Sequence, residues 1–297
     1  PKGIVLVGFP YDEGVRRNGG RVGAEKGPTT ARAQIQKVGT VVNPEFHVDV
    51  TKLNVYDFGN ISISEDEDLE HAHEKLQNSI KDIISHGSVP FIIGGGNDQS
   101  FPNAMGLLKN AEEKSVVVVN IDAHLDVRPL KEGKVHSGSP FFLLLNSDDW
   151  KSKGIGFVEF AAQGSQCSAI HSNFVEDNGG KICWFSQIRK QKSDEDMELP
   201  FSSNSTVGLL KDNLYSFDKK PQKIFLSFDI DSIQSSDCPG VSCPANVGLT
   251  AEEALDICYW AGTNPDVSLV DVSEFNPLIE DYRTARLVAN MFYYFLL

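Results

Sequence analysis

The chain has 297 residues, 40% hydrophobic and 23% charged, which is typical of a globular protein with one large α/β domain or two ordinary ones. Its net charge of −14 argues against nucleic acids and anionic membranes as partners, although local arginines can still bind a small anionic substrate. The five cysteines are odd in number and the chain is too long for a disulfide scaffold, so we expect reduced thiols; a disulfide between Cys238 and Cys243 stays open, and no CxxC pair indicates a zinc site. The opening PKGIVLVGFP lacks signal-peptide features and the final run MFYYFLL is too short to span a bilayer, so we expect a cytoplasmic protein.

Apolar, β-branched runs recur along the chain and predict strands at 3–9, 54–59, 89–95, 116–123, 157–163, 181–187, 223–231 and 267–275. Most of these runs are continuously apolar, which indicates a parallel sheet covered on both faces. Helices are predicted between them at 66–86, 100–110, 138–146, 171–178, 206–213, 250–262 and 280–294.

Two helix ends can be assigned to single residues: Thr250 is expected to be an N-cap and Gly262 a stop signal. The acidic segment 64–70 is predicted to begin a helix, and 190–198 to be a solvated loop. The pattern as a whole predicts one α/β domain over 1–297, with a parallel sheet of about eight strands between two layers of helices.

Polar clusters follow four of the predicted strands. DAHLD (122–126), SFDID (227–231), GGGND (94–98) and SEF (273–275) each stand where an apolar run ends. Because the carboxyl ends of parallel strands share one edge of a sheet, we expect these side chains to converge there. Converging carboxylates repel each other strongly at low dielectric, and a divalent cation removes that repulsion. Oxygen-rich ligation with one histidine suits Mn²⁺ or a similar ion.

These motifs, together with GFPYDEGVRRNGGRVGAEKGP (8–28), HSGSPF (136–141) and EFNP (274–277), resemble the ureohydrolases: arginase, agmatinase and formiminoglutamase. The opening segment and Arg128 of DVRP are most similar to formiminoglutamases. The resemblance implies a three-layer α/β/α sandwich, the arginase-like fold, and a binuclear manganese centre. The family commonly forms trimers or hexamers, so it also implies a homo-oligomer.

The resemblance implies six metal ligands, namely Asn97, Asp122, His124, Asp126, Asp229 and Asp231. Asp122 and Asp229 would bridge two Mn²⁺ ions, and Asn97 stands where most of the family has histidine. An amide oxygen is a neutral and poorer donor than imidazole, so we expect the ion beside Asn97 to be held more weakly.

The activity implied is hydrolysis of N-formimino-L-glutamate to L-glutamate and formamide in histidine degradation, by attack of a metal-bridging hydroxide on the formimino carbon. The catalytic residues carried over are His136, Asp126 and Glu274; His136 would shuttle a proton, and Glu274 would orient the cationic end of the substrate. The substrate carboxylates would be bound by Arg128 first, and by Arg16 and Asn18 second.

Two other functions remain open on the sequence. A guanidino hydrolase (agmatinase, arginase or guanidinobutyrase) would share the metal ligands, but agmatine has no carboxylate for Arg128 to bind. A catalytically impaired relative is suggested by Asn97 alone, whereas the intact DAHLD and SFDID motifs argue against it.

Overall fold

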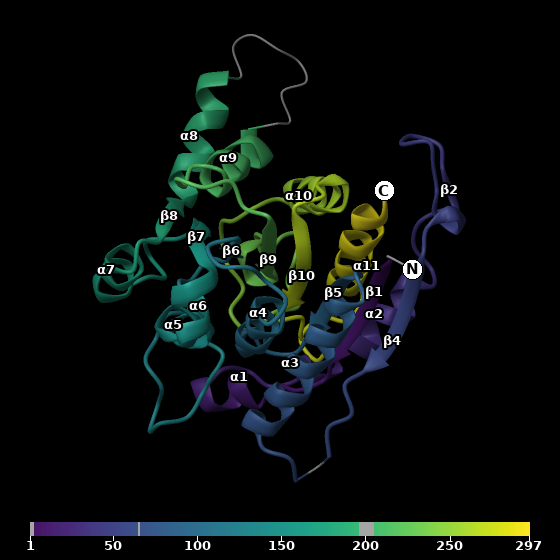
Figure 1. Ribbon diagram of the computed structural model, residues 1–297. Helices are drawn as coiled ribbons and strands as arrows, with labels where there is room; N and C mark the ends of the chain where they lie inside the picture. The colour runs from purple at the N-terminus through teal and green to yellow at the C-terminus, as the bar shows by residue number, and fades with distance from the viewer. Residues whose placement is uncertain (1–2, 65, 196–204) are drawn as a thin grey trace.

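Eight parallel strands form one sheet through the middle of the protein (Figure 1). The computed structural model describes residues 3–64, 66–195 and 205–297, and of 191–195 and 205 only the backbone. The strand order is β4-β1-β5-β10-β9-β6-β7-β8, and every neighbouring pair is parallel. The strands are β1 (Ile4–Phe9), β4 (Val55–Asn60), β5 (Val89–Gly94), β6 (Val116–Ile121), β7 (Gly154–Ala162), β8 (Lys181–Trp184), β9 (Lys223–Asp229) and β10 (Val267–Ser273). Each of them was predicted from the sequence, which confirms the parallel α/β fold.

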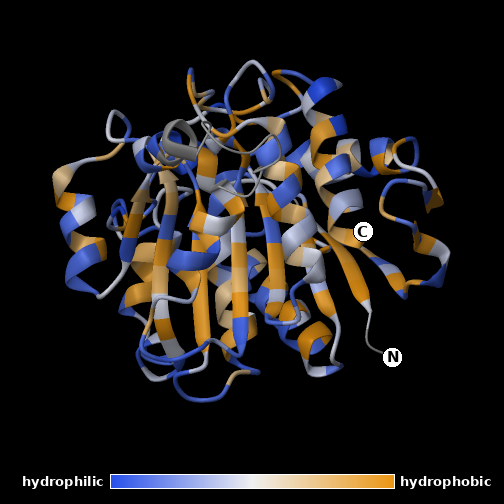
Figure 2. Cartoon of the chain, turned by 90° about the horizontal axis from the view of Figure 1, so that it is seen from above, coloured by the Kyte–Doolittle hydropathy of each residue, from blue (hydrophilic) through white to orange (hydrophobic). Residues whose placement is uncertain are grey.

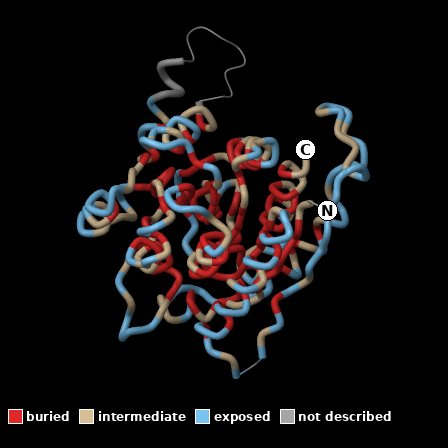
Figure 3. The backbone as a smooth tube through the Cα atoms, viewed as in Figure 1, coloured by how far each residue is buried: buried red, intermediate tan, exposed pale blue. Residues whose placement is uncertain are grey.

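The sheet is buried on both faces, as the continuous apolar runs require. In β6, Val117 and Val119 belong to one core cluster, while Val116 and Val118 belong to the other, because successive side chains point to opposite faces. The strands are mostly apolar in Figure 2, and the centre of the molecule is buried in Figure 3. The fold is therefore a three-layer α/β/α sandwich.

Each core cluster is closed by its own set of helices. The first cluster packs against α2 (Gly27–Ile35), α8 (Phe185–Glu195), α9 (Ser205–Leu214), α10 (Ala251–Thr263) and α11 (Arg283–Leu296). The second packs against α3 (Leu69–Ser85), α4 (Ser100–Leu108), α5 (Pro140–Asn146), α6 (Asp148–Lys153) and α7 (Ala169–Asp177). The remaining elements are α1 (Glu13–Asn18), the pair β2 (Val42–Asn43) and β3 (Val48–Asp49), and the 3₁₀ turns η1 (Ala24–Lys26), η2 (Val50–Lys52), η3 (Asn97–Gln99) and η4 (Ile230–Ser232). In the part of the chain that the structure describes, no helix is long and apolar enough to cross a bilayer.

Four helices, α1, α2, α6 and α8, were not predicted. The strand expected over 181–187 ends at Trp184, and α8 occupies most of the segment predicted as a loop over 190–198; residues 196–198 lie outside the described ones. Helix α8 is held by tertiary packing, because its Ile188 is fully buried against the sheet. Gly262 was also misinterpreted, since α10 continues past it to Thr263. A Cβ at Gly262 would collide with the backbone of Phe295, so the glycine permits close packing of α10 on α11.

The start of α10 is fixed by the N-cap that the sequence predicted. The Thr250 hydroxyl accepts a hydrogen bond from the Glu253 backbone N–H (3.2 Å), and the Glu253 carboxylate accepts one from the Thr250 backbone N–H (2.8 Å). This reciprocal capping box satisfies two backbone donors that the first turn of the helix leaves unpaired.

Replacing Thr250 with alanine is expected to destabilise the protein by about 1 kcal/mol, because the cap on α10 is lost. The midpoint of urea unfolding measures this change. The matched control is Thr263→Ala at the exposed end of the same helix, where the hydroxyl bonds only to carbonyls of the preceding turn. Equal shifts in the two variants would contradict the capping role of Thr250.

Candidate metal centre

Four adjacent strands carry the polar side chains that the sequence singled out. In the sheet β5, β10, β9 and β6 are consecutive. Asn97 begins η3 just after β5, Asp122 follows β6 directly, Asp229 ends β9, and Glu274 follows β10. These four side chains are buried. The predicted convergence at one edge of the sheet is therefore confirmed by the topology.

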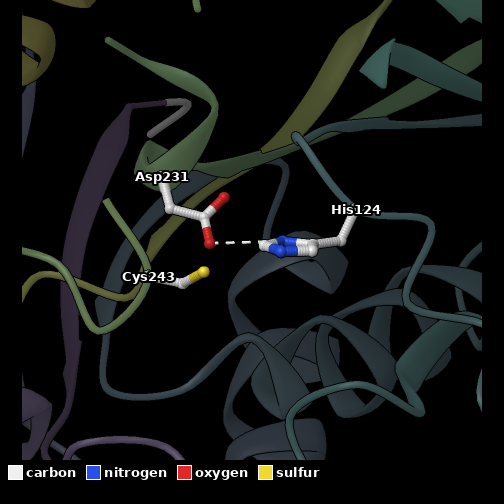
Figure 4. A group of neighbouring side chains, drawn as sticks. All are labelled: His124, Asp231 and Cys243. Atoms are coloured by element: carbon white, nitrogen blue, oxygen red, sulfur yellow. Dashed lines mark ion pairs between the residues drawn. The ribbon is translucent and has the colours of Figure 1, made fainter. Parts of the chain in front are cut away.

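Five of the predicted ligands form two groups, one of which also includes Cys243, and each group has one ligand atom per residue within 4.8 Å of the others. The first group is Asp122, Asp126 and Asp229; the second is His124, Asp231 and Cys243 (Figure 4). His124 joins the two groups, because its Nδ1 lies 3.2 Å from Asp122 Oδ1 and 3.3 Å from Asp231 Oδ2. The carboxylates of Asp122 and Asp126, which follow β6, thus lie within 4.8 Å of the Asp229 carboxylate at the end of β9. Ligands of one metal centre must lie this close together.

Burial and mutual repulsion raise the pKa values of three acids in this cluster, Asp126, Asp229 and Asp231. Burial, reinforced by Asp122, raises the pKa of Asp126 to about 7. Burial and the neighbouring Asp231 raise the pKa of Asp229 well above its usual range. The Asp231 carboxylate raises the pKa of the His124 imidazole. Positive charge in the form of protons therefore stabilises the cluster, and divalent cations would supply that charge more effectively.

The donor set fits two manganese ions. It offers four carboxylates, one imidazole and one amide, a mixture that is rich in oxygen. Asp231 Oδ1 is buried and has no hydrogen-bond partner among the described residues, although its side chain lines a cavity. A buried carboxylate oxygen without a partner is costly, and coordination to a cation would satisfy it.

Asn97 lies at the predicted position, but its amide is already engaged. Its Nδ2 donates to Asp126 Oδ2 (2.8 Å), and its Oδ1 accepts from the hydroxyls of Ser100 (2.9 Å) and Ser273 (3.0 Å). In this arrangement Asn97 orients the Asp126 carboxylate, and its oxygen points to the two serines. The adjacent Asp98 is engaged elsewhere, because its Oδ2 lies 2.8 Å from His73 Nε2.

Two residues of the centre have an unusual backbone. Asp126 has φ of 44° and Glu274 has φ of 68°, in the left-handed region that L side chains rarely occupy. Such strain persists where surrounding contacts hold it, and Glu274 Oε1 accepts a hydrogen bond from the Asn97 backbone N–H (3.1 Å). The strained backbone directs both carboxylates to the same cavity.

A cavity of about 180 Å³ opens over the acidic cluster. Its lining residues are Asn18, His124, Asp126, Arg128, Ser137, Asp229, Asp231, Cys243 and Glu274. The side of the cavity formed by Arg128 is also connected to the N-terminal segment, because the Arg128 guanidinium donates to Asn18 Oδ1 (3.4 Å) and Asn18 Nδ2 donates to Ser137 Oγ (3.0 Å). The cavity thus joins an acidic floor to a wall with a guanidinium group.

Two predicted residues are placed elsewhere. Arg16 is not among the described residues that line the cavity; its side chain is 67% exposed and pairs with Glu13 at 2.6 Å. His136 is buried, and both of its ring nitrogens meet the backbone: Nδ1 accepts from Gly138 N–H (3.1 Å) and Nε2 lies 3.1 Å from the Pro129 carbonyl. Burial lowers the pKa of His136, which favours the neutral form of its imidazole.

Ser137 and Cys243 line the cavity but were not predicted from the sequence to be site residues. Ser137 stands inside the HSGSPF segment, next to a nominated residue, so that motif contained a usable signal. Cys243 was noted only as a thiol, because its loop lies twelve residues beyond Asp231 and no local pattern connects the two. All five cysteines are free, so the disulfide between Cys238 and Cys243 is not formed.

Formiminoglutamases are among the known proteins to which this chain is similar. The formimidoylglutamase of Klebsiella pneumoniae is 30% identical over 294 residues, covering 98% of this chain and 84% of that protein. A crystal structure of Trypanosoma cruzi formiminoglutamase with Mn²⁺ matches with a TM-score of 0.89 at 47% identity, covering 100% of this chain and 93% of that one. A variant of the same enzyme with histidine in place of an asparagine, also with Mn²⁺, matches with a TM-score of 0.89 at 46% identity, covering 99% and 92%.

The match to a family extends over nearly the whole chain. The model of the arginase family matches residues 2–297. The eight-stranded parallel sheet between two layers of helices is the fold of the solved relatives, and the acidic cluster lies at the carboxyl edge of that sheet. This chain belongs to the arginase family.

Proposed function

We propose that this protein is a manganese-dependent hydrolase that converts N-formimino-L-glutamate to L-glutamate and formamide. The observation that carries the proposal is the cavity itself, in which the acidic cluster and Arg128 face the same small space. The substrate has an amidine-like group at one end and two carboxylates at the other. The names of the relatives support the same substrate.

Six side chains would hold two Mn²⁺ ions. Asp122 and Asp229 would be shared by the two sites, His124 and Asp231 would complete one site, and Asp126 would belong to the other. Asn97 would be a weak ligand of the Asp126 site, or the donor that orients the Asp126 carboxylate. When bound, the two ions supply the positive charge that makes water nucleophilic near neutral pH. The two groups of ligand atoms support this division.

The two ends of the cavity would orient the substrate. The Arg128 guanidinium would bind the carboxylates by charge-assisted hydrogen bonds, with Asn18 beside it. Glu274 would accept hydrogen bonds from the cationic formimino group, which would place the formimino carbon over the acidic floor. A substrate held at both ends reacts faster because less orientational freedom remains to be lost.

Proton transfer completes the reaction. Water adds to the formimino carbon, the bond from that carbon to the glutamate nitrogen breaks, and the departing amine takes a proton. Asp126 lines the cavity and would accept the proton of the attacking water. We retain His136 as the candidate proton shuttle: its neutral imidazole would take up a proton and pass it to the amine, which requires the ring to leave the Pro129 carbonyl when substrate binds.

The competing functions predict different roles for Arg128 and for the acidic cluster. Agmatine carries no carboxylate, so a guanidinium at the tail of the cavity would repel its cationic amine. The repulsion between four buried carboxylates is costly unless cations bind, and an impaired relative that binds no cations would have no reason to keep them together.

We also retain the expectations of one catalytic domain over 1–297, a homo-oligomer and a cytoplasmic location.

With Mn²⁺ added, the protein is expected to release formamide and glutamate from N-formimino-L-glutamate, and to act much more slowly on arginine, agmatine and 4-guanidinobutyrate. Removing the metal with a chelator should abolish turnover, and Mn²⁺ should restore it. Formamide and urea assays on the same samples separate these outcomes. Faster urea release from a guanidino substrate would overturn the assignment, and lack of turnover on every substrate would favour the impaired relative.

Arg128→Met is expected to raise the KM for N-formimino-L-glutamate by about 10- to 100-fold, because a hydrogen-bonded charge contributes about 1.5–3 kcal/mol. The matched control is Arg16→Met, which removes an exposed guanidinium outside the cavity and should leave KM unchanged. Steady-state kinetics on both variants gives the comparison. Equal effects in the two variants would contradict a role of Arg128 in binding the carboxylates.

Asn97→His is expected to tighten binding of the more weakly held Mn²⁺ ion by about tenfold or more, because imidazole is the better donor. Titration of the metal-free protein with Mn²⁺, followed by the signal of free Mn²⁺ in electron paramagnetic resonance, measures both sites. The control is Asn103→His, which alters another buried asparagine whose amide bonds to Asp271 (2.7 Å) behind the centre. Unchanged affinity in Asn97→His would contradict the weak-site prediction.

A further inference from the structure

Cys243 stands apart from the other cysteines of this protein. It is exposed and lines the cavity over the acidic cluster, whereas Cys183, Cys238 and Cys258 are buried and Cys167 is half-buried. Its sulfur lies within 4.8 Å of a ring nitrogen of His124 and a carboxylate oxygen of Asp231 (Figure 4). Three different donor types, a nitrogen, an oxygen and a sulfur, therefore meet at one point.

The loop that carries Cys243 is fixed by the N-terminal segment. The Arg21 guanidinium donates to the Ser242 carbonyl from Nε (3.0 Å) and from a terminal nitrogen (2.7 Å), and also to the Val241 carbonyl (3.0 Å). The Arg21 backbone N–H donates to Ser242 Oγ (2.8 Å). On the other side Val241 forms an antiparallel bridge with Phe275. The position of the thiol is thus set by contacts on both sides of its loop.

The carboxylate opposite the thiol has an unsatisfied oxygen. Asp231 Oδ2 is the atom that lies 3.3 Å from His124 Nδ1. Asp231 Oδ1 has no hydrogen-bond partner among the described residues, and the residue is only 4% exposed. A buried carboxylate oxygen without a partner favours binding of a cation to Asp231, whose other oxygen faces His124 Nδ1.

We propose that His124, Asp231 and Cys243 bind a thiophilic divalent cation such as Zn²⁺, with the Cys243 thiolate as a direct ligand. Zn²⁺ takes imidazole, carboxylate and thiolate donors, and three protein ligands with an open fourth position are typical of accessible zinc sites. The bond from the thiol sulfur to its proton is exchanged for a bond to the metal, and the proton passes to the buffer. This goes beyond the proposed hydrolysis, in which Cys243 has no part.

The thiolate would make this half of the centre selective for Zn²⁺ over Mn²⁺. Nitrogen and oxygen sites already bind Zn²⁺ more tightly than Mn²⁺, and a sulfur ligand increases that difference. Zn²⁺ bound by Cys243 would occupy His124 and Asp231, which the proposed Mn²⁺ centre also needs. Zn²⁺ is therefore expected to displace one Mn²⁺ ion, and Cys243 to set how readily it does so.

Binding of Co²⁺ tests whether Cys243 is a metal ligand, and it requires no substrate. Co²⁺ added to the metal-free full-length protein should produce an intense near-ultraviolet charge-transfer band from thiolate to metal, and excess Zn²⁺ should remove it. Cys243→Ser should abolish the band and weaken Zn²⁺ binding by more than about 100-fold, because losing a second-sphere partner alone costs about 10- to 100-fold. The matched control is Cys167→Ser, whose sulfur bonds to the Ala123 carbonyl (3.5 Å) and which should keep both the band and the affinity.

The result of this experiment does not depend on whether the protein catalyses the proposed hydrolysis, because no turnover is measured. The inference is overturned if bound Co²⁺, detected by its visible absorption, gives no thiolate band, or if the band persists in Cys243→Ser. Circular dichroism checks that the variants are folded. If the serine variant does not fold, alkylation of the exposed Cys243 in the folded wild type should remove the same band, and a band that survives complete alkylation of Cys243 also overturns the inference.

Discussion

The repulsion between buried carboxylates at one sheet edge is the constraint on which the site depends. Asp122, Asp126, Asp229 and Asp231 would separate or stay protonated if the chain were free to move. They cannot separate, because β6 and β9 are neighbours in a sheet whose two faces are packed by helices. The free energy of the folded core therefore holds together charges that only cations can neutralise fully.

Buried polar groups behind the centre hold the carboxylates in orientation. The Asn120 amide donates to Asp122 Oδ2 (3.2 Å) and to Glu159 Oε2 (3.0 Å), so it connects a predicted ligand to a second acid inside the sheet. The Ser100 hydroxyl lies near Asn97, Ser227 and Asp271 and so connects the turn after β5 with β9 and β10. A metal centre needs such partners, because they fix the direction of each ligand before a cation binds.

The N-terminal segment completes the cavity from outside the sheet. Asn18 contacts Arg128 and Ser137, and Arg21 fixes the loop that carries Cys243. Arg17, just before Asn18, donates to Glu70 and to the Val135 carbonyl, which ties the same segment to α3 and to the loop before His136. The wall of the cavity therefore comes from parts of the chain that are more than one hundred residues apart, and its shape depends on the whole fold.

The sequence by itself determined the eight strands, their parallel arrangement and the ligand cluster, because buried strands and strand-end acids are local patterns. Only the tertiary structure decided that α8 is a helix, that Arg16 lies outside the cavity and that Cys243 lies inside it. It also decided that the Asn97 oxygen faces two serines while its nitrogen faces Asp126. The physical reason is that the direction of a side chain in a loop is set by contacts with distant segments, which carry no signature in the neighbouring residues.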